Sequence, residues 1–162
     1  MKTIKSILLG SLFALTTAAN AHDYKAGDLH IDHPWSKQVP PTSQVAAAFF
    51  SIMNHGDNGD ELLSATSPIA GKTELHAHIH EDGMMKMREV EKIDVPAHGS
   101  QMLKPGGYHV MFFDLKEVPE LGESFLDFNF KQAGEVKVEV KVEEATYIPE
   151  GMKKEKMDHS HH

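Results

Sequence analysis

Four side chains in this sequence could bind a soft metal ion together: His76, Met87, His109 and Met111. Ten residues separate His76 from Met87, twenty-one separate Met87 from His109, and one separates His109 from Met111. Two imidazoles and two thioethers form an uncharged, soft-to-borderline ligand set, which suits Cu(I) better than Cu(II). The chain contains no cysteine, so any copper chemistry here depends on methionine and histidine.

A hairpin around Asp82-Gly83 is needed to bring the first two side chains together. This pair of residues is typical of a two-residue hairpin turn. With that loop, Met87 lies opposite His78, and His76 is its diagonal neighbour on the same face. A three-residue loop would place His76 and Met87 on opposite faces.

A second strand is expected to carry the other two side chains. His109 and Met111 share one face of it, because residues at i and i+2 point the same way. Turn residues at 105–107 would place His109 at the rim of the fold. Each methionine taken singly could instead fill a gap in the core, so the case for a shared site depends on the combination and its spacing.

The rest of the chain has the pattern of an all-β protein. Valines at 136, 138, 140 and 142 alternate with charged residues, which predicts a strand with one solvated face. Further strands are expected at 45–53, 74–80, 108–113 and 125–130, with turn residues between them. Short strands at close spacing predict a β-sandwich with Greek-key connections.

The two ends of the chain differ from this middle. Residues 1–21 combine a basic start, a short apolar run and an Ala19-Asn20-Ala21 cleavage site, which predicts a signal peptide rather than a membrane span. Residues 22–148 are expected to form one copper-binding domain, and residues 149–162 a flexible tail rich in His and Met. The predicted location is the periplasm, without membrane insertion after cleavage.

Composition narrows the possible functions. The net charge of −8 argues against nucleic acid as a partner. A blue-copper electron carrier needs a cysteine thiolate, and a thiol reductase needs cysteine as well, so both are excluded. No Ser-His-Asp pattern, supported carboxylate pair or phosphate loop is recognisable, and the chain is therefore not expected to be an enzyme.

The spacing of the four side chains, and the residues around them, resemble the periplasmic copper chaperones of the PCu(A)C family. The family pattern is His or Met, ten residues, Met, twenty-one residues, His, one residue and Met, and this chain matches every interval. The resemblance covers residues 23–145 and includes the segments His33-Pro34-Trp35, Glu74-Leu75-His76, 81–88 and 103–111.

This resemblance implies a cupredoxin-like β-sandwich that binds Cu(I) through those four side chains. It also implies delivery of copper to a receiving protein, either the dinuclear copper centre of cytochrome c oxidase subunit II or another copper chaperone. The chain departs from many relatives at 77–80, where His78 and His80 are candidate auxiliary ligands.

Both ends of the chain offer further candidate ligands. Histidine-rich tracts bind borderline metals, so the tail is a candidate Cu(II) site. Cleavage after Ala21 would expose the amine and imidazole of His22 together, a pair that chelates Cu(II). The auxiliary candidates at the ends are His22, Met152, Met157, His159, His161 and His162. A merely solvated tail and an arbitrary first residue are the simpler alternatives.

Two functions other than delivery remain open. A periplasmic copper buffer or resistance protein would bind several ions through the tail and have no dedicated recipient. A copper oxygenase would use His22, but it would also need a second histidine nearby and an open substrate face.

Overall fold

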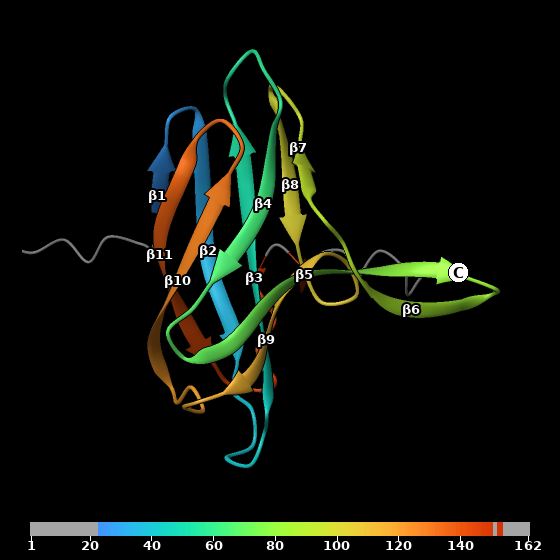
Figure 1. The fold of residues 1–162 in the computed structure, drawn as a ribbon, viewed down its shortest axis with the longest axis vertical. Helices are drawn as coiled ribbons and strands as arrows, with labels where there is room; N and C mark the ends of the chain where they lie inside the picture. The colour runs from blue at the N-terminus through green and yellow to red at the C-terminus, as the bar shows by residue number, and fades with distance from the viewer. Residues whose placement is uncertain (1–22, 151, 154–162) are drawn as a thin grey trace, which may run out of the picture.

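The computed structural model describes residues 23–150, 152 and 153, which form strands and connecting turns apart from one short helical turn at the end (Figure 1). The eleven strands of this part are β1 (Asp23–Ala26), β2 (Leu29–Lys37), β3 (Val45–Asn54), β4 (Asp60–Thr66), β5 (Ala70–Glu81), β6 (Met84–Glu89), β7 (Ile93–Val95), β8 (Gly99–Leu103), β9 (His109–Leu115), β10 (Gly122–Phe130) and β11 (Gly134–Glu143). The all-β prediction is confirmed. Within the same residues, no helix is long and apolar enough to cross a membrane.

The alternating valines lie where the pattern places them. Val136, Val138, Val140 and Val142 of β11 are all buried, while Lys137 and Lys141 between them are exposed. The other predicted strands correspond to β3, β5, β9 and β10. Period-two alternation is therefore a reliable guide for β11, because one of its faces packs on the core and the other meets water.

The strands form one continuous mixed sheet that packs against itself. Its order is β6-β5-β9-β3-β2-β11-β10-β4-β7, with β1 on β2 and β8 on β3. All pairings between these strands are antiparallel except that of β2 with β11. Phe50 of β3 meets Phe128 of β10 with 4.2 Å between ring centroids, so residues of distant strands face each other across the core as in a sandwich.

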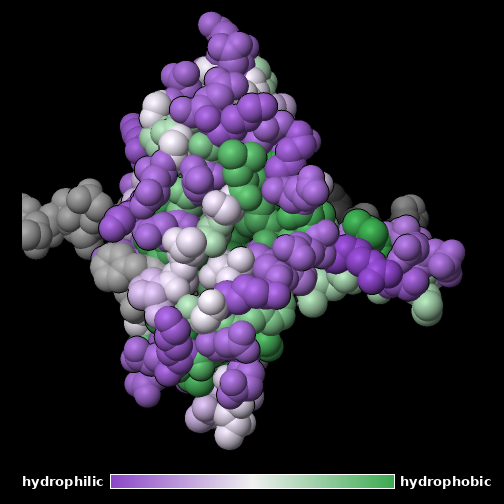
Figure 2. All heavy atoms as spheres, viewed as in Figure 1, coloured by the Kyte–Doolittle hydropathy of each residue, from purple (hydrophilic) through white to green (hydrophobic). Residues whose placement is uncertain are grey.

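The hairpin of β5 and β6 extends beyond this body as an arm (Figure 1). Pairing of β5 with β9 reaches only to His76 and His109, and past that point β5 pairs with β6 alone. The turn at the tip contains Asp82 and Gly83, with φ angles of 53° and 75°, as a two-residue type I′ turn requires. Hydrophilic residues cover most of the arm in Figure 2. The predicted two-residue loop is thus confirmed.

Candidate metal centre

Three neighbouring strands bring the candidate ligands to the base of the arm. The β5–β6 register sets His78 opposite Met87, as the two-residue loop predicts. The β5–β9 register sets His76 opposite His109. Met111 lies two residues farther along β9 and therefore on the same face as His109.

His109 lies at the centre of this group. Its Nε2 atom is 3.2 Å from the sulfur of Met87. Its ring centroid lies 5.8 Å from that of His76 and 5.3 Å from that of His78. On the side of the body, Phe49 packs 6.2 Å from the same ring. The structure therefore gathers three imidazoles and one thioether, with an aromatic wall behind them.

Burial differs sharply across the four residues matched by spacing. His109, His76 and Met111 expose 3%, 7% and 9% of their surface, whereas Met87 exposes 44%. The first three belong to strands of the sheet body, while Met87 belongs to the arm. The candidate centre is thus buried on the side of the sheet body and accessible to solvent at Met87.

Hydrogen bonding orients the His109 ring. Its Nδ1 lies 3.1 Å from the carbonyl oxygen of Gly107, which can only accept, so we assign the proton to Nδ1. Burial lowers the pKa of His109, and the neighbouring His78 and His76 lower it further, against the opposing effect of the Gly107 carbonyl. The ring is therefore neutral near pH 7, with the lone pair of Nε2 directed at Met87.

The His76 ring is held in a similar way by a carboxylate. Its Nε2 lies 2.8 Å from Oε2 of Glu74, and its buried Nδ1 has no hydrogen-bond partner among the described residues. The ion pair with Lys72, followed by the bond to His76, lowers the pKa of Glu74. Glu74 is thus ionised and accepts a hydrogen bond from Nε2–H of His76, which in the neutral ring places the lone pair on Nδ1. Metal-binding imidazoles commonly have this arrangement.

Glu74 is a contributor that the sequence reasoning missed. The segment Glu74-Leu75-His76 enters the family resemblance, but no role is assigned to its first residue. The sequence did contain a signal for this contact: Glu74 and His76 are spaced i, i+2, which places both side chains on one face of a strand. Glu74 of β5 lies directly opposite Met111 of β9, so its carboxylate borders the candidate centre.

The chemistry of the donor set depends on sulfur. Within the described residues, no three imidazole or carboxylate groups lie close enough together to hold a metal ion. The thioether of Met87, 3.2 Å from Nε2 of His109, adds a soft donor to the imidazoles at the base of the arm. A donor set that includes sulfur favours a soft ion such as Cu(I).

The auxiliary candidates fall into separate places. His78 joins the group around His109, while His80 lies farther out on the arm with its Nδ1 2.9 Å from the sulfur of Met85. Met152 lines a cavity of about 400 Å³ beside β2, β3 and β8. The predicted ligands outside the described residues are His22, Met157, His159, His161 and His162.

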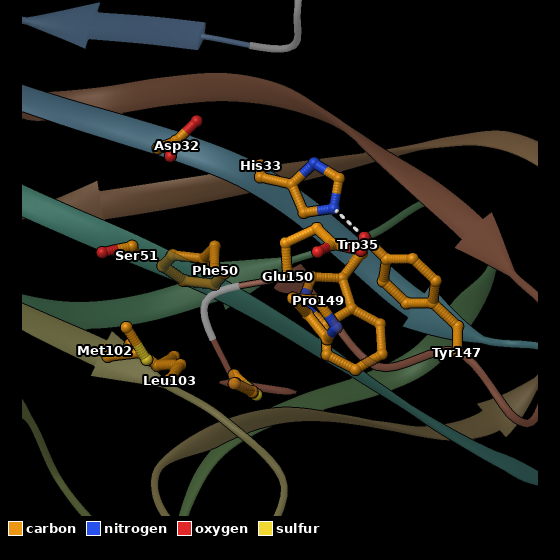
Figure 3. Close-up of a pocket in the computed structure, with 11 residues that line it drawn as sticks. Asp32, His33, Trp35, Phe50, Ser51, Met102, Leu103, Tyr147, Pro149 and Glu150 are labelled. Atoms are coloured by element: carbon orange, nitrogen blue, oxygen red, sulfur yellow. Dashed lines mark hydrogen bonds between the residues drawn. The ribbon is translucent and has the colours of Figure 1, made fainter. Parts of the chain in front are cut away.

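The cavity that Met152 lines contains a different set of contacts (Figure 3). Nε2 of His33 lies 2.8 Å from the hydroxyl of Tyr147, whose ring packs edge-on against Trp35 with a centroid distance of 5.2 Å. His33 has a φ of 48° at an irregularity in the β2–β3 pairing. These contacts hold the segment that follows β11 against the sheet, and they give His33 a structural role.

Comparison with known proteins identifies a family and relatives that this chain resembles. The family described as "Putative lipoprotein LpqE-like" matches residues 29–142. A "Putative lipoprotein Lxx21020" from Leifsonia xyli subsp. xyli is 30% identical over 125 residues, which cover 75% of this chain and 74% of the relative.

Two solved structures show the same fold. The apo PCuAC domain from PmoF1 is 25% identical with a TM-score of 0.67, covering 76% of this chain and 99% of that domain. The Cu(I) form of DR1885 from Deinococcus radiodurans is 25% identical with a TM-score of 0.58, covering 77% and 83%. The predicted cupredoxin-like fold is confirmed, and the chain belongs to the LpqE-like, or PCuAC, family.

Proposed function

We propose that this chain binds Cu(I) through His76, Met87, His109 and Met111 and passes the ion to another protein. The 3.2 Å contact between His109 Nε2 and Met87 Sδ carries the proposal. With its Nδ1 proton donated to Gly107, the neutral His109 ring directs a lone pair at a sulfur atom that can only accept. A cation bound by both atoms would accept electron density from the Nε2 lone pair and from the sulfur.

The character of the ligands selects the oxidation state. All four side chains are uncharged when His76 and His109 are neutral, and three of them are buried. A singly charged ion is less costly to place in such surroundings than a doubly charged one, and thioether sulfur favours Cu(I) on chemical grounds. Similarity to a protein solved with Cu(I) bound supports the same choice.

The uneven burial of the ligands suits delivery better than storage. A partner can approach the exposed Met87 and exchange one of its own ligands for that thioether while the buried imidazoles still hold the ion. The family resemblance points to the dinuclear copper centre of cytochrome c oxidase subunit II, or another copper chaperone, as the recipient. The proposed location is the periplasm, after removal of residues 1–21.

Loss of either central ligand should weaken Cu(I) binding. For Met87→Ala and His109→Ala we expect the affinity to fall more than the roughly 10- to 100-fold that loss of a residue orienting a ligand costs. Anaerobic titration against a competing Cu(I) chelator measures this. Met102→Ala is a matched control, because Met102 is 45% exposed and Met87 44%, yet Met102 borders the other cavity. Full affinity in both ligand variants would contradict the proposal.

Glu74 should matter through the orientation of His76 rather than through direct binding. In Glu74→Gln the side chain keeps its shape but loses the charge that holds the Nε2 proton, and we expect Cu(I) affinity to fall about 10- to 100-fold. Glu89→Gln is the control, because Glu89 lies opposite His76 on β6 and is exposed. Equal affinities for the two variants would show that the Glu74 contact has no influence on binding.

Delivery can be separated from buffering by a transfer assay. The Cu(I)-loaded chain is mixed with the isolated copper domain of cytochrome oxidase subunit II, and copper is measured on each protein after separation. We expect copper to leave this chain and appear on the domain in equal amounts. If copper stays on the chain even with excess acceptor, buffering becomes the better description.

Cleavage of the signal peptide predicts a specific mass for the mature protein. Cleavage after Ala21 would give a periplasmic chain that begins at His22, with no added mass. A relative is described as a lipoprotein, but this sequence has no cysteine to carry the lipid. The alternative is an uncleaved form that keeps residues 1–21 as an anchor, and it would be heavier and remain with the membrane fraction. Intact mass spectrometry of both fractions distinguishes the two forms.

A further inference from the structure

The arm carries soft ligands beyond those of the inner centre. Directly opposed residues on a hairpin share a face, and the β5–β6 register pairs His78 with Met87 and His80 with Met85. All four side chains therefore lie on one face of the arm. This face runs from the base of the arm, where His76 lies opposite His109, to the His80–Met85 pair, the second pair from the turn.

The contact between His80 and Met85 repeats the one at the inner centre. Nδ1 of His80 lies 2.9 Å from the sulfur of Met85, just as Nε2 of His109 lies 3.2 Å from the sulfur of Met87. His78 lies between these two pairs along β5, with its ring 5.3 Å from that of His109. Imidazole and thioether groups thus continue from the buried wall out to solvent.

The opposite face of the arm has a different chemistry. There Glu81 forms ion pairs with Arg88 at 2.8 Å and with Lys86 at 3.1 Å. These cross-strand contacts help to hold the two strands together. Met84, the neighbour of Glu81 across the hairpin, lies on this charged face and is 60% exposed, against 54% for Met85. Two adjacent methionines of similar exposure therefore lie on faces of different chemistry.

We propose that His80 and Met85 form an outer Cu(I) site through which copper enters and leaves the inner centre. This inference rests on the proposed function. Each step is a ligand exchange: a bond from copper to the next donor forms as a bond to the previous donor breaks, and the ion remains Cu(I). His78, one rung inward and opposite Met87, takes the ion between His80 and the Met87 thioether of the inner centre. With only two ligands from this chain, the outer site leaves positions for ligands of a partner.

Methionine methyl signals can test occupancy of the outer site. The whole exported chain is labelled with ¹³C at its methionine methyl groups and titrated anaerobically with Cu(I), which is diamagnetic. We expect the first equivalent to shift the Met87 signal and the second to shift that of Met85, with Met84 unchanged. A Met85 signal that moves no more than that of Met84 overturns the outer site. A Met87 signal that does not move at all instead counts against the proposed function.

Transfer kinetics test the role of this site in copper exchange. A Cu(I)-specific chelator in excess withdraws copper from the loaded chain, and the rate is compared for Met85→Leu and Met84→Leu, two swaps that conserve volume. We expect a roughly tenfold slower rate only for Met85→Leu, equivalent to about 1.4 kcal/mol in the barrier. Equal rates for the two variants overturn the role in exchange. Copper binding by the wild-type chain in the same assay reports separately on the inner centre.

Discussion

The register of the β5–β6 hairpin is the constraint on which the candidate centre depends. The pairing of His78 with Met87 follows from a loop of two residues, in which Asp82 and Gly83 both have positive φ angles. Because side chains alternate along a strand, a slip of one residue would turn every imidazole and thioether of one strand to the face that carries the ion pairs. A small turn therefore determines the chemistry of a whole surface.

A second requirement is that the imidazoles present lone pairs rather than protons. Two acceptors of different kinds meet this requirement: the Gly107 carbonyl for His109 and the Glu74 carboxylate for His76. Burial helps as well, because it lowers the pKa of His109. The core beneath, which reaches His109 through Phe49, keeps these rings in place before any ion arrives. The orientation of the candidate ligands and the stability of the fold thus depend on the same packed side chains.

Local pattern was enough to predict β3, β5, β9, β10 and β11, together with the hairpin turn and the pairing of His78 with Met87. It could not predict the pairing of His76 with His109, because the register of two strands far apart in the chain depends on packing across the whole sheet. The role of Glu74 was missed for a different reason: the i, i+2 spacing places it on the same face as His76, but does not show which ring nitrogen its carboxylate contacts. Likewise, nothing in the residues around Tyr147 indicates that its hydroxyl bonds to His33.

The openness of Met87 has a chemical consequence beyond exchange. A thioether that a partner protein can reach is also within reach of peroxide and other oxidants, which convert it to a sulfoxide. The sulfoxide is polar and bonds to metals mainly through oxygen, so the soft donor is lost while the strand that carries it stays intact. Buried Met111, at 9% exposure, is shielded by comparison. Under oxidative stress, the proposed copper binding would then depend on reduction of the Met87 sulfoxide back to the thioether rather than on the stability of the fold.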